Sequence, residues 1–312
     1  MLLIRGQHNL REHHCGCVAT IGNFDGVHLG HKAVLEALKV RAVAHALPSL
    51  VIIFEPQPLE YFCPDKAPAR LTRLREKLAL LREVGIDRVM LLRFDQDLSS
   101  LTAEQFVQKM LIDALGVKHL FVGDDFCFGK GRTGNFDLLV NMGRDHGFTV
   151  ENLATVSTDG ERVSSTRIRE ALAVGDFDTA ARCLGREYRM CGRVVHGHKK
   201  GRTIGFPTLN IGLARRLSPV KGVFAVQVSG LGDELIDGVA NVGNRPVLEG
   251  DDQFLLEVHL FDFDRQVYGE LVSVRFVERL RDERNFESFE LMREQILLDA
   301  EMARVACERV SI

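Results

Sequence analysis

The chain contains 312 residues, of which 46% are hydrophobic and 27% charged, and its formal net charge is −3. These values are typical of a soluble globular protein and exclude a positive field that would attract nucleic acid or an anionic membrane, so we expect neither partner. The length suits two domains, since one core rarely grows beyond about 300 residues. Apolar runs fall short of the roughly 20 residues that span a bilayer. The seven cysteines, an odd number, indicate free thiols, and we therefore expect a cytoplasmic protein.

Short apolar runs alternate with helix-period segments from Cys17 to about Leu172. The runs are nearly continuous in apolar residues, as expected for strands covered on both faces. Regular alternation of strand and helix predicts a parallel sheet with helices on both sides, a doubly wound α/β domain. The expected strands are 17–24, 50–55, 88–94, 119–123 and 149–155, and the expected helices are 31–46, 74–85, 103–116, 135–147 and one that opens near Ser164.

The pattern changes after about Gly185, where strand-like runs follow one another with Gly, Asp and Asn at the turns. Several strands closed by one helix, residues 285–307, predict a β-barrel domain with a C-terminal helix against its side. We place the two domains at 1–184 and 185–312. The expected strands are 187–197, 222–230, 235–243, 254–263 and 271–280. The apolar stripe expected on the helix is Phe289, Met292, Ile296, Ala300 and Ala303.

The segment GNFDGVHLGH, residues 22–31, follows the first expected strand of the α/β domain. Open parallel sheets bind ligands beyond the carboxyl ends of their strands, and the first amides of a helix favour an anion. His28 and His31, three residues apart, can present two imidazole donors to a triphosphate. The alternative is a turn with two solvated histidines. The predicted ATP-binding residues here are Gly22, Phe24, Asp25, Gly26, His28 and His31, with both histidines also predicted to be catalytic.

The segment VSSTRIRE, residues 163–170, places three hydroxyl residues at the expected start of a helix. Such hydroxyls often do no more than cap a helix. An arginine three residues after Thr166 favours a phosphate site, because its guanidinium can neutralise a phosphate on the same face. We predict that ATP contacts Ser164, Ser165, Thr166 and Arg169, and that Arg169 is also catalytic.

The segment VGDDFCFGKGRTGNFDLL, residues 122–139, combines acids, aromatics and glycines after a strand end. Phe126 and Phe128 could stack on a flat ring while Asp125 contacts a polar edge. A packed loop explains the same residues equally well.

The segment HGHKKGRTIGFPTLNI, residues 196–211, is rich in Gly, Lys and Arg. Thr208 and Asn210 point the same way if the segment is extended, and their oxygens suit Mg²⁺. The alternative is a surface turn that leads into a barrel strand. The predicted ATP-binding residues here are Gly201, Arg202, Gly205 and Thr208, and the predicted metal ligands are Thr208 and Asn210.

Glu257 lies in an otherwise apolar expected strand, FLLEVHLFDF. A carboxylate there costs free energy unless it has a task or a partner. We predict that Glu257 acts as a general base that takes a proton from a hydroxyl attacking a γ-phosphate. The alternative is a carboxylate at a solvated rim.

Taken together, the motifs of the first half resemble the FMN adenylyltransferase module of prokaryotic bifunctional flavin enzymes, a member of the HxGH nucleotidyltransferase superfamily. The resemblance rests on GNFDGVHLGH, FEPQPLEYF, VGDDFCFGKGRTGNFDLL and VSSTRIRE. The ordered set GRTIGFPTLN, GVFA, NVGNRPV, EVHLFDFDRQVYG and LRDERNFESFELMREQI is similar to the riboflavin kinase module and covers essentially the whole second half.

This resemblance implies two reactions, phosphorylation of riboflavin to FMN with ATP and Mg²⁺, and adenylylation of FMN to FAD with release of pyrophosphate. It also implies that Thr208 and Asn210 hold the metal and that Glu257 is the base. The implied flavin contacts are Asp125, Phe126, Phe128, Asn241, Arg279, Arg281 and Phe286. Leu209 and Val247 depart from residues common in the family and bear on substrate contacts more than on the reaction class.

Two other functions fit the sequence patterns. The first half could be a nucleotidyltransferase for another phosphate acceptor, joined to a passive flavin-binding barrel. The chain could also be a non-enzymatic sensor of flavin or nucleotide. Self-association is left open.

Overall fold

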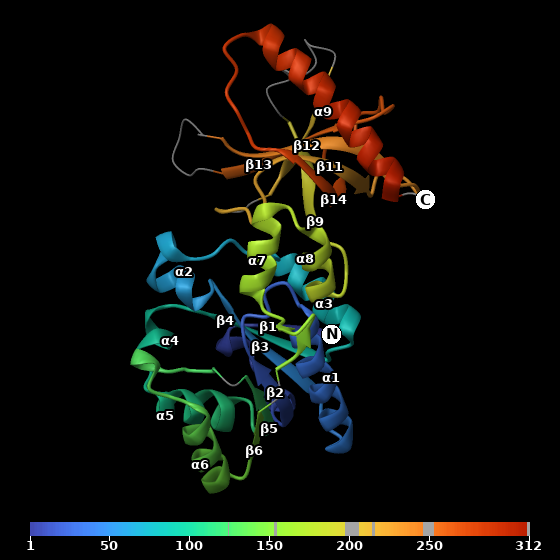
Figure 1. The fold of residues 1–312 in the computed structure, drawn as a ribbon. Coiled ribbons are helices and arrows are strands. Elements are labelled where there is room, and N and C mark those ends of the chain that lie inside the picture. Colours follow the sequence, from blue (N-terminus) through green and yellow to red (C-terminus); the bar gives the residue numbers. More distant parts are fainter. Residues whose placement is uncertain (124, 153–154, 197–205, 214–215, 246–252, 311–312) are drawn as a thin grey trace. The chain divides into compact units, whose positions relative to one another are not determined.

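The computed structural model describes residues 1–123, 125–152, 155–196, 206–213, 216–245 and 253–310. The chain forms two compact units, shown as a ribbon in Figure 1. The first unit consists of Met1–Ala67 and Leu74–Val163, and the second of Pro68–Arg73 and Ser164–Ile312.

The first unit contains a six-stranded sheet in which every pair of neighbouring strands is parallel, as far as the described residues go. Its strands are β1 (Leu2–Arg5), β2 (Cys17–Ile21), β3 (Ser49–Glu55), β4 (Arg88–Arg93), β5 (Val117–Val122) and β6 (Thr149–Asn152). The strand order is β1-β4-β3-β2-β5-β6. The predicted parallel sheet is confirmed, and β1 is an edge strand that the sequence pattern did not reveal.

Helices cover both faces of this sheet, which confirms the doubly wound architecture. Alternate strand residues separate the two cores: Val18 and Val51 pack with α1 and α3, whereas Ala19 and Leu50 pack with the segment from α5 to α6. The helices are α1 (Leu29–Ala44), α2 (Pro58–Phe62), α3 (Leu74–Val84), α4 (Gln96–Ser100), α5 (Ala103–Phe106), the π-helical η4 (Val107–Ala114) and α6 (Phe136–His146). Short 3₁₀ turns are η1 (Gln7–Asn9), η2 (Glu12–His14), η3 (Pro64–Lys66) and η5 (Lys130–Arg132), and a small hairpin pairs β7 (Ser157–Thr158) with β8 (Glu161–Arg162).

The strand order reverses beside β2, because β3 lies on one side of it and β5 on the other. In open α/β sheets the ligand crevice opens at such a reversal, outside the carboxyl ends of the strands. The loop that leaves β2 at this point is residues 22–28, which leads directly into α1.

The second unit contains a closed antiparallel barrel, in the order β10-β13-β12-β11-β14-β9 over the described residues, which confirms the predicted fold. Two helices, α7 (Ser165–Val174) and α8 (Phe177–Leu184), precede the barrel, and α9 (Phe289–Val310) follows it. The strands are β9 (Arg189–Val195), β10 (Leu209–Gly212), β11 (Gly222–Ser229), β12 (Ile236–Arg245), β13 (Gln253–Leu260) and β14 (Leu271–Arg281).

Alternation along the strands gives the barrel an apolar interior and a second, outer core under α9. Leu256 and Val258 are fully buried on one face of β13. The outer face contributes Val223 and Val239, which pack against Ala303 of α9. The predicted stripe on α9 is confirmed for Ala303 and, as half-buried residues, for Met292, Ile296 and Ala300. It is wrong for Phe289, which is 52% exposed because the buried residues of α9 begin only at Asp299.

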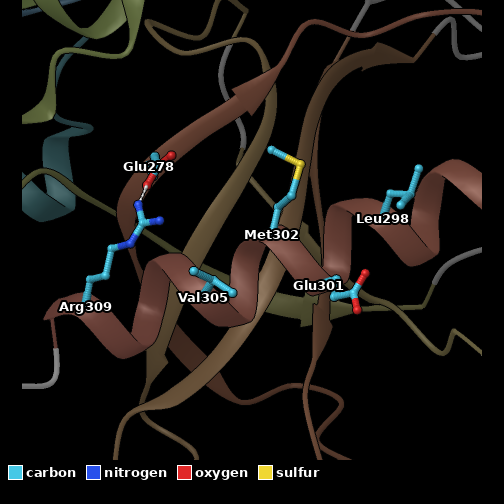
Figure 2. A pocket seen from close by; sticks show the side chains of 6 residues that line it. All are labelled: Glu278, Leu298, Glu301, Met302, Val305 and Arg309. Atoms are coloured by element: carbon cyan, nitrogen blue, oxygen red, sulfur yellow. Dashed lines mark ion pairs between the residues drawn. The ribbon is translucent and has the colours of Figure 1, made fainter.

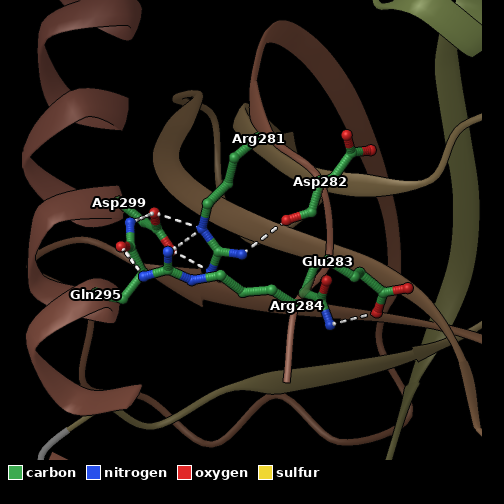
Figure 3. Close-up of polar contacts among 7 residues, drawn as sticks. Arg281, Asp282, Glu283, Arg284, Gln295 and Asp299 are labelled. Atoms are coloured by element: carbon green, nitrogen blue, oxygen red, sulfur yellow. Dashed lines mark hydrogen bonds and ion pairs between the residues drawn. The ribbon is translucent and has the colours of Figure 1, made fainter. Parts of the chain in front are cut away.

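A buried ion pair fastens α9 to the end of β14, as Figure 3 shows. Asp299 is only 3% exposed and accepts hydrogen bonds from Arg281 Nε at 2.9 and 3.1 Å and from Arg281 Nη2 at 2.7 Å. Gln295 Nε2 donates to the same carboxylate at 2.7 Å. Because a buried carboxylate needs such partners, Asp299 and Arg281 stabilise the helix only together.

Residues 68–73 belong to the second unit although they lie within the first half of the sequence. Arg73 Nη1 donates to Leu213 O at 2.8 Å, and Arg73 Nη2 donates to Cys191 O. The Tyr188 hydroxyl donates to Leu71 O at 3.5 Å. This short segment is therefore hydrogen-bonded to residues at β9 and directly after β10.

Candidate nucleotide and flavin sites

The loop after β2 has an unusual backbone. Phe24, Gly26 and Val27 have φ angles of 46°, 85° and 42°. Residues other than glycine rarely adopt a positive φ angle. The backbone strain of such a residue persists only where the surrounding structure enforces it. Phe24 and Val27 are both buried in the core on the α1 side of the sheet, and this packing holds the loop in place. The conformation of the loop that leads to His28 is therefore fixed by the packing of Phe24 and Val27.

His28 is the N-cap residue of α1. Its ring Nδ1 accepts a hydrogen bond from His31 N at 3.3 Å. Because Nδ1 is an acceptor, a neutral His28 carries its proton on Nε2, which is then a donor. The helix begins at Leu29, two residues before the predicted start. The expectation that both histidines lie at a helix start after a strand is confirmed.

The two imidazoles lie face to face. Their centroids are 3.6 Å apart with an angle of 16° between the rings, and the Phe24 ring lies 5.0 Å from that of His31. A Cβ added to Gly30 would approach the His28 ring to 3.2 Å, so the third glycine of the motif leaves room for this arrangement. The histidines thus form one rigid pair.

His31 is half-buried, and its Nδ1 is buried with no hydrogen-bond partner among the described residues. Burial lowers the pKa of His31 well below 6.5, and the nearby His28 and Lys77 lower it further. The imidazole is therefore neutral at pH 7. A neutral ring at the positive end of a helix can donate to a phosphate oxygen without carrying a charge of its own.

We expect the free energy of unfolding to fall as the pH drops below about 6.5 and to change little just above it. Burial lowers the pKa of His31 in the folded state, and burial also lowers the pKa of His14 and His119, so the unfolded chain binds more protons below pH 6.5. Urea unfolding at pH 5 to 8 measures this slope, and His31→Gln should make it shallower. Identical slopes for the variant and the wild type would contradict the assignment.

Lys77, on α3, is a residue that the sequence reasoning missed. It is 1% exposed and close enough to lower the pKa of His31. A fully buried lysine is rare in a protein without a specific environment. The signal was present in the sequence, because Lys77 falls on the helical stripe formed by Leu74, Leu78 and Leu81.

The hydroxyl cluster lies at the start of α7, in the second unit. The Ser164 side chain accepts a hydrogen bond from Arg167 N at 3.2 Å and so acts as an N-cap, the role that we considered as the alternative. Ser165 and Thr166 are the first two residues of the helix, and Arg169 Nε donates to Ala69 O at 2.6 Å. That this cluster and His28 meet at one nucleotide stays a prediction.

The loop after β5 is partly core. Phe128 is buried and exchanges backbone hydrogen bonds with Gly134, so it fits the packed-loop alternative. Phe126 is half-buried and stacks parallel to it at 5.4 Å. Asp125 is exposed, 3.8 Å from Arg162. Flavin contacts at this loop stay predictions.

A row of three polar residues crosses the outer face of the barrel. Asn210 of β10 is paired with Glu257 of β13, and Glu257 is paired with Asn241 of β12. Directly paired residues of antiparallel strands point to the same face, with Cβ atoms about 5 Å apart. The face is the outer one, because Asn241 is paired in turn with Val223, which packs under α9. The barrel thus brings together two amides and a half-buried carboxylate that lie 16 to 47 residues apart in sequence.

The oxygens near Asn210 suit a hard cation. Asn210 is 7% exposed, and its Oδ1 is buried without a hydrogen-bond partner among the described residues. Thr208 is exposed two residues earlier, and the preceding Pro207 O lies 2.9 Å from His259 Nδ1. An orphaned buried oxygen beside a hydroxyl and a carboxylate fits Mg²⁺. The other ATP-binding residues predicted on this segment, Gly201, Arg202 and Gly205, and the departure at Val247, lie outside the described residues.

The end of β14 carries the remaining predicted flavin contacts. Arg279 is paired through Nη2 with Asp282, while its Nε is buried and has no hydrogen-bond partner in the described part of the chain. The Arg281 guanidinium is engaged by Asp299. Phe286 lies under two guanidinium groups, 4.7 Å from that of Arg284 and 5.8 Å from that of Arg281.

Figure 2 shows a cavity of about 260 Å³ beside α9. Its lining residues are Glu278, Leu298, Glu301, Met302, Val305 and Arg309. None of the predicted site residues borders it. The candidate sites are therefore defined by polar side chains and loop geometry rather than by this cavity.

Two family profiles match the sequence, one described as FAD synthetase over residues 10–167 and one as riboflavin kinase over residues 184–307. The chain is 52% identical over 304 residues to a Pseudomonas fluorescens protein and 50% identical over 305 residues to one from Escherichia coli (strain K12). Each alignment covers 97% of both chains, and both relatives are named bifunctional riboflavin kinase/FMN adenylyltransferase.

A solved structure also resembles the whole chain. A protein from Streptococcus pneumoniae, described as a macrolide-efflux protein, matches with a TM-score of 0.78 and 29% identity. The match covers 97% of this chain and 99% of that one. Across the described residues, no helix combines the length and apolarity needed to cross a membrane.

Proposed function

Because the chain belongs to the family of bifunctional riboflavin kinases/FMN adenylyltransferases, we propose that it converts riboflavin to FMN and then FMN to FAD, with ATP as co-substrate of both steps. The observation that carries the proposal is about 50% identity to such enzymes along 97% of the chain. The two family profiles support assigning residues 1–184 to the adenylyltransferase and residues 185–312 to the kinase.

The polar row on the barrel supports the kinase reaction. We assign Glu257 as the base that takes the proton from the primary hydroxyl of riboflavin as this oxygen bonds to the γ-phosphorus of ATP and ADP leaves. Thr208 and Asn210 would hold Mg²⁺, which neutralises phosphate charge when bound. Asn241, Arg279 and the rest of the predicted flavin contacts would orient the acceptor.

The histidine pair supports the adenylyl transfer. A phosphate oxygen of FMN attacks the α-phosphorus of ATP, and pyrophosphate leaves, so no proton has to be removed from the nucleophile. His28 and His31 would donate hydrogen bonds to the phosphate oxygens, together with the first amides of α1. Ser164, Ser165, Thr166 and Arg169 would contact the remaining phosphates.

The experiment that tests this function supplies riboflavin and ATP with Mg²⁺ or with EDTA, and follows FMN and FAD over time. FMN should appear first and FAD later, and EDTA should stop the reaction. If no FMN formed from riboflavin while FAD still formed from supplied FMN, the barrel would only bind flavin and would not be a kinase. Bound flavin without turnover would favour a sensor.

The setting of the enzyme is also a proposal. We place it in the cytoplasm, where its substrates are small molecules and its cysteines stay reduced. None of the seven cysteines, all of which lie within the described residues, forms a disulfide bond, which supports this location. We expect no nucleic-acid partner, and we leave self-association open.

A further inference from the structure

The amide of Asn241 is held in one orientation by Glu283. Asn241 Nδ2 donates to Glu283 Oε1 at 3.4 Å, and Asn241 Oδ1 is buried without a hydrogen-bond partner among the described residues. The opposite orientation would set the amide oxygen against a carboxylate oxygen, so the carboxylate selects this one. Glu283 therefore determines which end of the amide is available to a ligand.

The carboxylate of Glu283 is itself fixed against β12. A Cβ added to Gly243 would lie 1.9 Å from Glu283 Oε1, so only glycine at this position permits the approach. Gly243 and Asn241 are two residues apart on the same strand and share a face. Lys221 Nζ lies 3.9 Å from Glu283 Oε2, and the side chain of Glu283 is only 31% exposed. Two residues of β12 thus position the Glu283 carboxylate: Asn241 donates to it, and Gly243 leaves room for it.

Asn241 is a neighbour of the proposed base on the same face of the barrel. Asn241 is paired with Glu257 across β12 and β13, on the outer face of the barrel. An amide oxygen accepts hydrogen bonds and cannot donate them, so its partner in a ligand must be a donor. Riboflavin carries such donors in its ribityl hydroxyls and its ring N–H.

We infer that Glu283 is a positioning residue of the kinase site: it orients Asn241 so that the amide oxygen accepts a hydrogen bond from a donor group of the flavin. This inference rests on the proposed function, because it takes the flavin to bind beside Glu257. Glu283 acts through Asn241 and does not touch the reacting atoms.

The test compares Glu283→Ala with Glu283→Gln in riboflavin phosphorylation. Loss of one oriented hydrogen bond should raise the KM for riboflavin about fivefold in Glu283→Ala while kcat stays within about twofold. The glutamine variant keeps an acceptor oxygen for Asn241 Nδ2 and should remain near the wild-type KM. Conversion of supplied FMN to FAD should be unchanged in both, and the retained kcat for riboflavin phosphorylation reports that the barrel is folded.

A double-mutant cycle separates positioning from a merely structural role. If Glu283 acts through Asn241, Glu283→Ala should add almost nothing to the KM of Asn241→Ala. Glu278→Gln is the matched control, because Glu278 is an exposed carboxylate on β14 whose ion pair is with Arg309; its KM should equal that of the wild type.

Three results would overturn the inference: additive effects, an unchanged KM in Glu283→Ala, or a glutamine variant as impaired as the alanine variant. If Asn241→Ala itself left the KM unchanged while FMN was still formed, the flavin placement beside Asn241 would fail. Absence of FMN formation in the wild type would instead refute the proposed function.

Discussion

Replacing His28 with alanine is expected to reduce FAD formation from FMN by at least about 100-fold while leaving FMN formation from riboflavin close to the wild-type rate. His28 supplies a donor on Nε2 at the start of α1 and stacks on His31 at 3.6 Å, so its removal also unsettles the second imidazole. Loss of a single preorganised donor to a developing oxyanion commonly costs about 100- to 1,000-fold in rate. Separate assays with supplied FMN and with riboflavin measure the two activities.

His28 is also the N-cap residue of α1, and this structural role must be separated from its proposed role as a hydrogen-bond donor to phosphate. As N-cap it accepts from His31 N, and loss of a cap costs about 1 kcal/mol of stability. His28→Asn retains a capping side chain without an imidazole, and it should lose FAD formation as fully as His28→Ala with less loss of stability. His146→Ala, at an exposed position near the end of α6, is the control and should retain both activities. Wild-type FAD formation in His28→Asn would show that His28 serves only as a cap.

Glu257→Gln is expected to show the reverse pattern, with FMN formation reduced by about 100- to 10,000-fold and FAD formation from supplied FMN retained. The amide keeps the size of the side chain but cannot take a proton, and a general base typically contributes this much to the rate. Glu257 is paired with Asn210 and Asn241 through the backbones of neighbouring strands. This pairing does not depend on the carboxylate, so the change should leave the barrel intact.

Glu278→Gln provides the matched control for Glu257. Glu278 is an exposed carboxylate on β14, away from the polar row, and its ion pair with Arg309 at 3.6 Å lies on the surface. Its loss should change neither rate. If Glu257→Gln or His28→Ala abolished both activities in a protein that unfolds like the wild type, the division into two sites would be wrong.

Local sequence patterns predicted the features that depend on short-range periodicity. The parallel strands, the barrel and the helix start at the histidines follow from apolar runs and glycine turns. The edge strand β1 was missed because four residues show too little periodicity to be distinguished from a terminal segment. The buried position predicted for Phe289 was wrong. The apolar stripe of α9 begins at Phe289, but the buried residues of the helix begin only at Asp299.

The remaining features depend on contacts between residues that are distant in sequence. In the sequence, Asp299 resembles any exposed carboxylate on a helix. Only the folded chain shows that Arg281 of β14 binds it. Nothing in the segment around Glu283 reveals that its carboxylate reaches Gly243 and Asn241, forty residues earlier. By contrast, the polar row was partly predictable, because strand alternation had already separated Glu257 from its buried neighbours Leu256 and Val258. Pairing between strands, rather than the pattern within one strand, decides such sites.

The segment 68–73 has a consequence for how the two enzymes can be divided. The backbone passes between the units after residue 67, after residue 73 and again after residue 163, so neither unit is one continuous segment of the chain. A fragment beginning at residue 185 would lack the arginine that binds the carbonyl oxygens of Cys191 and Leu213. A fragment of residues 185–312 is therefore expected to unfold at a lower urea concentration than a fragment that also carries residues 68–73 grafted onto its new terminus.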